Sequence, residues 1–272
     1  MADMLRILSD LHFRDARTQV RELRQLEPLL AGVQTLVING DSCEMRLGTT
    51  PAQVEALRAF FRERVPEVIF ITGNHDPDIS DTHELLVAGG QVWVTHGDVC
   101  FEDLTPWSRH AAELRRRVEA ELAAVSVADR ERLDVRLQIA RRVARAEQNL
   151  PDLSEDGWWG HLKWAWHTFF PPRVVLAMLR SWRDLPGLAT RLAVRERSAA
   201  RVVVMGHVHF PGVWRRPGGP TIINTGSFFR PLGGSLVDVV NDRVRVSRIV
   251  RRGTGFHAGR LIAEIKLDNR AS

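Results

Sequence analysis

The sequence predicts an α/β protein in which a block of helices interrupts a core of β-α-β units. The first hundred residues repeat short apolar runs, each ending in a glycine or a polar residue and each followed by a helical segment. From Glu102 to about Ala200 apolar residues take helical spacing among many arginines, and after Arg201 the strand pattern returns. We therefore expect a core formed by residues 1–101 and 201–272 and a helical insertion, or lid, formed by residues 102–200.

The first part of the core is expected to contain four strands and a helix. The helix begins at Pro51, because Thr50 is a good N-cap and Gln53 completes a capping box, and Val54, Leu57 and Phe61 then share one face. A further short strand precedes the fourth and forms a hairpin with it across Ala88-Gly89-Gly90. The four strands are Met4–Leu8, Thr35–Ile38, Val68–Thr72 and Gln91–Thr95, and the added one is Glu84–Val87.

The insertion is predicted to be helical throughout. Its first helical pattern is carried by Leu104, Trp107, Ala111, Leu114, Val118, Leu122 and Val125. Gly157 to Pro172 is rich in aromatic residues, and Pro171-Pro172 is expected to start a short helix through Trp182. The aromatic residues of that segment are Trp158, Trp159, Trp164, Trp166, Phe169 and Phe170, which form either a small core of the lid or an apolar groove.

The last part of the core returns to strands. Val202–Met205 and Thr221–Asn224 are short apolar runs. Ser235–Val240 and Arg243–Val250 are expected to form a hairpin that turns at Asn241-Asp242.

Composition excludes several classes of protein. A chain of 272 residues with 44% hydrophobic and 26% charged residues is neither disordered nor a coiled coil. No apolar run approaches the length of a transmembrane helix, and the first residues lack the pattern of a signal peptide. Two cysteines are too few for a disulfide framework, which favours a cytoplasmic location. The net charge is +5 and all but two of the 38 basic residues are arginines, so peripheral contact with the inner face of a membrane stays open.

Residue types that bind metals follow the ends of the predicted strands. In open α/β sheets, ligand-binding residues converge at the carboxyl ends of the strands. Residues i and i+2 of an extended segment point the same way, so two such pairs can each present two ligands to one place. The seven candidates are Asp10, His12, Asp41, Asn74, His96, His207 and His209.

This set of donors favours two transition-metal ions. Carboxylate, amide and imidazole donors without thiolate suit Mn, Fe or Zn. Seven candidates are too many for one open catalytic ion, whereas a pair of ions about 3.5–4 Å apart needs a bridging carboxylate. Asp41 is the expected bridge.

The ordered motifs resemble those of the calcineurin-like metallophosphoesterase superfamily. Its pattern is D-x-H, G-D-x-x-D, G-N-H-D/E, H and G-H-x-H, and every motif matches except that Glu44 stands where the second usually ends in aspartate. The resemblance covers residues 1–101 and 201–272 and implies a four-layer α/β sandwich of two mixed β-sheets flanked by helices. It also implies one ion, Mn²⁺ before Fe or Zn, on Asp10, His12, Asp41 and His209, and a second on Asp41, Asn74, His96 and His207.

Within that superfamily the chain looks most like the UDP-2,3-diacylglucosamine pyrophosphatase group. The shared features are Glu44, the His96-Gly97-Asp98 run with Cys100 and Asp103 behind it, Pro211 and a helical lid before the last motif. The group has arginine where His75 stands. The implied substrate is a phosphodiester or pyrophosphate, with a nucleotide-linked lipid as the specific candidate.

The expected catalytic residues are His75 and Asp76. His75 would protonate the leaving oxygen or stabilise the transition state, held by Asp76, although it could also simply cap its turn. Arg14 and Arg230 follow motif residues and are candidates to bind a phosphate oxygen.

Other functions of this superfamily remain open. Phosphomonoesterase or protein phosphatase action is the main alternative. A nuclease is disfavoured because the arginines of the insertion alternate with acidic residues, as on a solvated helix face. A non-catalytic scaffold would lack ligands, and none of the seven is missing. The sequence indicates no oligomeric state.

Overall fold

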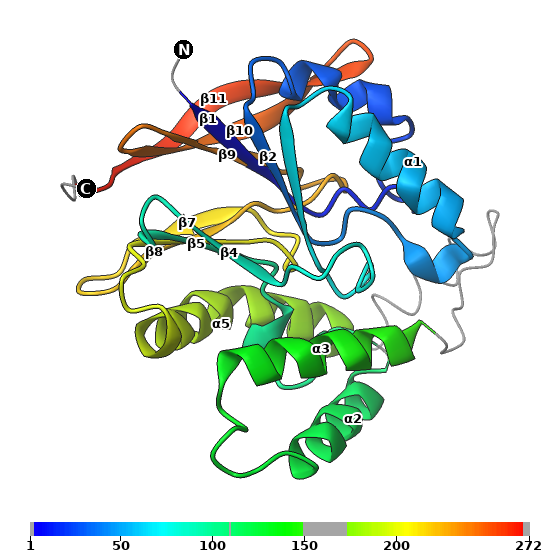
Figure 1. The fold of residues 1–272 in the computed structure, drawn as a ribbon, viewed down its shortest axis with the longest axis vertical. Helices are drawn as coiled ribbons and strands as arrows, with labels where there is room; N and C mark the ends of the chain where they lie inside the picture. The colour runs from blue at the N-terminus through cyan, green and yellow to red at the C-terminus, as the bar shows by residue number, and fades with distance from the viewer. Residues whose placement is uncertain (1–2, 109, 149–172, 269–272) are drawn as a thin grey trace.

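The computed structural model describes residues 3–108, 110–148 and 173–268. Two mixed β-sheets lie face to face with helical segments on their outer sides (Figure 1), which is the predicted sandwich. The helical elements are η1 (Leu23–Leu29), η2 (Met45–Leu47), α1 (Pro51–Arg62), η3 (Asp98–Cys100), α2 (Ala111–Ala123), α3 (Leu133–Glu147) and α5 (Arg173–Glu196), where η marks a 3₁₀ helix.

The first sheet has six strands in the order β11-β10-β9-β1-β2-β3. Strands β1, β2 and β3 run parallel, because 3₁₀ helix η1 and then helix α1 cross over between them, whereas β9, β10 and β11 are joined antiparallel by tight turns. The strands are β1 (Met4–Leu8), β2 (Thr35–Asn39), β3 (Glu67–Ile71), β9 (Ser235–Val240), β10 (Arg243–Arg252) and β11 (Gly255–Lys266).

The second sheet has five strands in the order β4-β5-β6-β8-β7. Strands β5, β6 and β8 are parallel, and β4 and β7 close the two edges antiparallel. The helices of the insertion lie between β5 and β6 along the chain, yet these two strands are neighbours in the sheet. The strands are β4 (Glu84–Val87), β5 (Val92–Thr95), β6 (Val202–Met205), β7 (Gly212–Trp214) and β8 (Thr221–Asn224).

Successive side chains of each strand point to opposite faces of its sheet and so pack into separate apolar layers. In β2, Val37 faces the layer between the two sheets, whereas Leu36 and Ile38 face helix α1. In β5, Trp93 faces α5 while its neighbours Val92 and Val94 face the other sheet. Helices α2 and α3 share a smaller core of their own. The parallel strands are therefore buried on both faces, as their continuous apolar runs predict.

Three details differ from the sequence prediction. The first helix of the insertion begins at Ala111, because Pro106 and a left-handed backbone at Leu104 break the expected helix before it. Helix α5 continues past Trp182 to Glu196 despite Pro186, since Leu185 and Ala189 beyond that point are buried against the second sheet. Strands β7 and β11 carried no recognisable signal, one being three residues long and the other interrupted by Gly259.

Part of the predicted lid lies outside the described residues. This holds for the aromatic cluster Trp158 to Phe170 and for the proline pair that follows it. The division into a core and an insertion at residues 101 and 201 stays a prediction. In the part of the chain that is described, no helix is both long enough and apolar enough to cross a membrane.

Candidate metal centre

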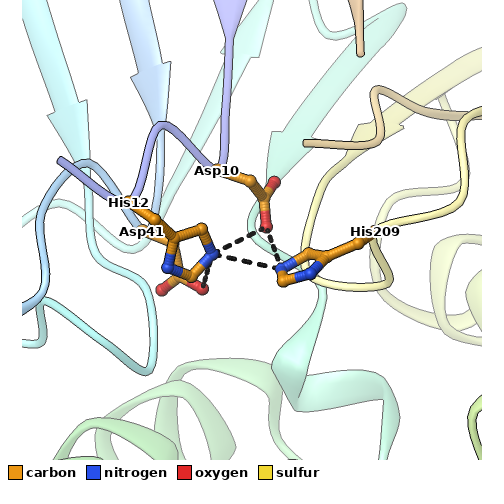
Figure 2. Close-up of side chains that lie close together, drawn as sticks. All are labelled: Asp10, His12, Asp41 and His209. Carbon is orange, nitrogen blue, oxygen red and sulfur yellow. Dashed lines mark hydrogen bonds and ion pairs between the residues drawn. The ribbon is translucent and has the colours of Figure 1, made fainter. Parts of the chain in front are cut away.

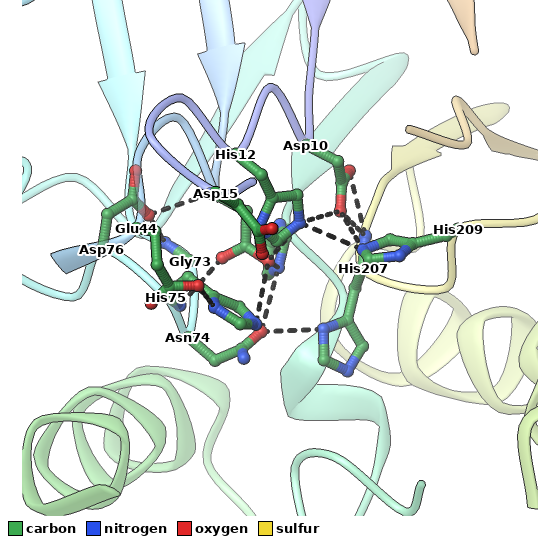
Figure 3. Close-up of polar contacts among 12 residues, drawn as sticks. Asp10, His12, Asp15, Glu44, Gly73, Asn74, His75, Asp76, His207 and His209 are labelled. Carbon is green, nitrogen blue, oxygen red and sulfur yellow. Dashed lines mark hydrogen bonds and ion pairs between the residues drawn. The ribbon is translucent and has the colours of Figure 1, made fainter. Parts of the chain in front are cut away.

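The seven predicted ligands converge at one edge of the sandwich. Each follows the carboxyl end of a parallel strand: Asp10 and His12 after β1, Asp41 after β2, Asn74 after β3, His96 after β5, and His207 and His209 after β6. Six are buried, and the His209 side chain is 23% exposed. Because strands of both sheets end here, the site lies between the two halves of the core (Figures 2 and 3).

The backbone turns that carry these ligands differ from the extended segments assumed above. Asp10, His12, Asp41 and His207 have φ angles of 51°, 45°, 51° and 67°, in the left-handed region that side chains rarely adopt. The amide N–H of Asp10 donates to the Gly40 carbonyl and that of His12 donates to the Asp41 carbonyl, so neighbouring loops hold one another. Such conformations cost energy and concentrate at functional sites.

The first group of ligand atoms consists of Asp10 Oδ1, His12 Nε2, Asp41 Oδ2 and His209 Nε2 (Figure 2). His12 Nε2 lies 3.1 Å from His209 Nε2 and 3.5 Å from Asp41 Oδ2, and His209 Nε2 lies 3.4 Å from Asp10 Oδ1. These four residues are the set predicted for one ion, and their atoms lie within 4.8 Å of one another.

The second group contains Asp41, His96, His207 and Asn74. Asn74 Oδ1 lies 2.9 Å from His207 Nδ1 and 3.3 Å from His96 Nε2, which is itself 3.4 Å from Asp41 Oδ2. Asp41 Oδ2 therefore faces both groups. This is the position of a bridging carboxylate between two ions.

Hydrogen bonds behind two of the histidines orient their rings. His96 Nδ1 donates to the Asn39 carbonyl at 3.0 Å, and His207 Nε2 donates to the Leu104 carbonyl at 2.7 Å. In each neutral ring this places the proton on the outer nitrogen and leaves the lone pair of the other nitrogen facing the cluster.

Burial and neighbouring charges shift the pKa values of several residues of the cluster. Burial opposes a charge on His96, yet Asp41 raises the pKa of this imidazole well above its ordinary value. Burial likewise opposes charge on Asp41, but His96 and His75 hold its pKa far below the usual range. Burial lowers the pKa of both His12 and His207. The residues fit divalent ions, because imidazole, carboxylate and amide donors converge here without thiolate and would bind an ion in place of a proton.

The structure corrects the predicted partner of His75. Asp76 accepts hydrogen bonds from the backbone N–H groups of Asp41, Ser42 and Gly73 and from the Ser42 hydroxyl, so it holds the loop of the bridging ligand. His75 Nδ1 instead lies 2.5 Å from Glu44 Oε2 (Figure 3). Burial opposes protonation of His75, but the carboxylates of Glu44 and Asp41 together raise the pKa of the imidazole.

Two contributors to the site were missed from the sequence. Glu44 enters the sequence analysis as a departure from the superfamily motif and as a feature shared with one group, but not as the partner of His75, although its place three residues after Asp41 is a usable signal. Phe229 stacks on His12 at a ring-centroid distance of 4.7 Å and lies edge-on to His209 at 5.0 Å. Phe229 follows strand β8, and no sequence motif there marks it as part of the site. Only the fold shows that it contacts the candidate ligands.

The predicted phosphate-binding arginines lie on the surface. Arg14 is exposed, and exposed Arg230 donates from Nε to Gln19 Oε1 at 3.2 Å. The Arg17 guanidinium lies 5.5 Å from the ring of Phe229, which packs on two of the candidate ligands, and it is bound by the buried carboxylate of Asp15. A substrate role for Arg14 and Arg230 stays a prediction.

Three comparisons with known proteins were made for this chain. The sequence matches the calcineurin-like phosphoesterase family over residues 5–211. No curated protein matches it in sequence. Among solved structures, Vacuolar Protein Sorting 29 from Cryptosporidium parvum is 12% identical with a TM-score of 0.45 and covers 97% of this chain and 98% of its own. A dimetal phosphatase from Danio rerio is 13% identical with a TM-score of 0.45, covering 94% and 98%.

A third similar structure is the phosphopantetheinyl hydrolase of Mycobacterium tuberculosis. It is 16% identical with a TM-score of 0.35 and covers 83% of this chain and 90% of its own. At such identities and scores these three likenesses carry no argument about activity.

Proposed function

This chain belongs to the calcineurin-like phosphoesterase family, and from that membership we propose that it is a dinuclear phosphohydrolase cleaving a phosphodiester or pyrophosphate bond next to an apolar group. The family match and the clusters of metal-binding residues together support a metal-dependent phosphoester hydrolase. The dinuclear centre is supported by the pair of ligand groups sharing Asp41, and the apolar group of the substrate by a pocket beside the ligands.

We assign Asp10, His12, Asp41 and His209 to one divalent ion and Asp41, Asn74, His96 and His207 to the other. Mn²⁺ is the expected ion, with Fe and Zn as alternatives. When bound, such ions neutralise phosphoryl charge and make a water molecule more acidic. The chain's own contribution is to hold six donor residues around the shared carboxylate of Asp41 in a largely buried place.

His75 is suited to proton transfer to the leaving oxygen. Its Nδ1 is bonded to Glu44, so Nε2 is the nitrogen that can donate a proton to substrate. The ring lies edge-on to the ligand His12 at 4.7 Å, which puts it beside the first ligand group. Glu44 orients the imidazole and stabilises its charged form, as the aspartate of a Ser-His-Asp triad does for the catalytic histidine.

An apolar pocket beside the ligands supports an apolar substituent on the substrate. It is lined by Trp107, Met178, Val208, His209 and Phe210, so one of its walls is a proposed metal ligand. On the same helix as Met178, the side chains of Leu176, Leu179 and Trp182 are exposed. A nucleotide-linked lipid such as UDP-2,3-diacylglucosamine fits this combination, with peripheral contact at the inner face of the membrane in the cytoplasm.

The test compares three substrates on Mn²⁺-loaded protein: a nucleotide-lipid pyrophosphate, a small phosphodiester and a phosphomonoester. We expect hydrolysis of the first two, with the lipid substrate preferred. Activity on the monoester alone would overturn the proposal in favour of a phosphomonoesterase or protein phosphatase.

A variant in the pocket makes the test specific. Met178→Ala should raise KM for the long-chain substrate and leave the small diester unaffected, because only the lipid reaches that wall. Leu261→Ala is the control, since Leu261 is an exposed apolar residue on the distant strand β11. Equal behaviour of both variants on the lipid substrate would remove the lipid assignment.

A further inference from the structure

Glu147 is a buried carboxylate at the end of α3, outside the ligand cluster. Its side chain is 3% exposed, and a carboxylate so buried needs partners to remain stable. One partner is Ser108, whose hydroxyl donates to Glu147 Oε1 at 3.4 Å. The other is Arg46, whose Nη1 lies 3.4 Å from the same oxygen. Glu147 therefore joins the inserted helices to the core loop after β2.

Arg46 in turn contacts His75, the proposed proton donor. Its Nε donates to Glu44 Oε1 at 3.1 Å, and its Nη2 lies 2.7 Å from His75 Nδ1. Glu44 thus divides its two oxygens, one binding Arg46 and the other binding His75 at 2.5 Å. A single path of close contacts runs from the insertion to the ring of His75.

Helix α3 also holds the loop that follows His75. Arg141 Nε donates to the Pro77 carbonyl at 2.7 Å, and Arg145 Nε donates to Asp78 Oδ1 at 2.6 Å. These two arginines are four residues apart and so lie on one face of the helix. Their ion pairs are partly exposed and contribute little to stability, but together with the Glu147–Arg46 contact they show that α3 is docked along both loops of the Glu44–His75 pair.

We propose that Glu147 is a positioning residue, which holds Arg46 so that Glu44 keeps one oxygen for His75. The inference rests on the hydrolase function proposed above and deepens it, because it makes the geometry of proton donation depend on the inserted helices. The physical reason is competition. When Glu147 loses its charge, the Arg46 guanidinium is drawn toward Glu44, which it also contacts, and displaces the His75 ring.

The experiment uses Glu147→Gln in the full-length, metal-loaded protein and two phosphodiesters, one with a nitrophenol and one with an alcohol leaving group. We expect kcat to fall about 10-fold for the alcohol ester and less than about 2-fold for the nitrophenyl ester, since only the poor leaving group needs the proton. KM and metal content should not change. In a His75→Ala background, Glu147→Gln should have no further effect on kcat.

A spectroscopic readout does not depend on turnover. In the ¹⁵N-labelled, Zn²⁺-loaded protein, the Nδ1 resonance of His75, assigned by its loss in His75→Ala, should shift in Glu147→Gln. The matched control is Glu121→Gln, which breaks an exposed ion pair between α2 and Arg142 of α3 and should change neither the resonance nor the kinetics. If Glu147→Gln fails to fold, Glu147→Asp keeps the buried charge but withdraws the carboxylate from Arg46 by one methylene, and it should give the same leaving-group pattern in weaker form.

The outcomes separate the two proposals. Equal losses with both esters, additivity with His75→Ala or an unmoved resonance would mean a merely structural Glu147 and would overturn the positioning role while the hydrolase stands. Absence of any phosphoester hydrolysis by the wild type with Mn²⁺, Fe²⁺ or Zn²⁺ would overturn the proposed function, and the His75 resonance would then decide the role of Glu147 alone.

Discussion

Asp41→Asn should remove metal from one ligand group more than from the other. The first group has two carboxylates, those of Asp10 and Asp41, whereas the second has only that of Asp41 beside neutral donors. Asparagine keeps the shape of the side chain and tolerates the φ of 51° at this position, so the loop should persist. Its amide oxygen can still accept from the His75 backbone N–H, as Asp41 Oδ1 does at 2.9 Å.

The magnitude follows from the loss of charge. Removing a contact behind a metal ligand already weakens binding by about 10–100-fold, so loss of the bridging charge should weaken the second ion by about 100-fold or more. Bound metal should fall from close to two ions per chain to one or fewer. Phosphoesterase activity should fall below roughly 1% of wild type, since both ions contribute to phosphoryl-group charge neutralisation.

The assay combines metal analysis of the dialysed protein with hydrolysis of a small nitrophenyl diester. Asp238→Asn is the control, because Asp238 forms an ion pair with Arg6 inside the first sheet, far along the strands from the ligands. It should keep both ions and the activity. Retention of two ions and of activity by Asp41→Asn would refute the bridging assignment.

Three further predictions concern the proton donor, the lid and the cysteines. His75→Ala should keep both ions and lower turnover by roughly 10²–10⁴-fold, with a smaller loss for a nitrophenol leaving group; loss of metal would make His75 a ligand instead. Changing Trp164 and Trp166 together to alanine should raise KM for a long-chain lipid pyrophosphate and spare a small diester, and the wild type should co-sediment with anionic vesicles in a salt-sensitive way; equal effects without vesicle binding would leave these residues a packing role. Burial raises the pKa of the Cys100 thiol to about 12 and also raises that of Cys43, so iodoacetamide at pH 8 should modify neither in the folded protein and both in urea; rapid labelling of the native chain would contradict this.

Local sequence patterns were sufficient for most of the core. The run Thr35–Ile38 becomes β2, and the Thr50-Pro51-Gln53 cap starts α1 where predicted, because period, capping and turn chemistry act over a few residues. The prediction was wrong where tertiary packing outweighed a local signal. Pro186 should end a helix, but burial of Leu185 and Ala189 on the second sheet keeps α5 continuous.

The convergence of the seven candidate ligands could be predicted because strand ends of a parallel sheet meet at one edge whatever the details of their loops. The seven side chains do meet, although through left-handed turns that the sequence argument did not foresee. The partner of His75 could not be predicted in this way. Its immediate neighbour Asp76 points to the loop of Asp41, and the contact comes from Glu44, 31 residues earlier in the chain.

The sequence by itself therefore determined the strand and helix pattern and the ligand chemistry, since both depend on residue type and spacing along the chain. Only the tertiary structure decided which oxygen faces both ligand groups, that Phe229 packs on His12, and that Glu147 of the insertion reaches Arg46. The physical reason is that these contacts join residues from separate loops and helices. Their distances are set by how the two sheets and the inserted helices pack, and no local pattern encodes that packing.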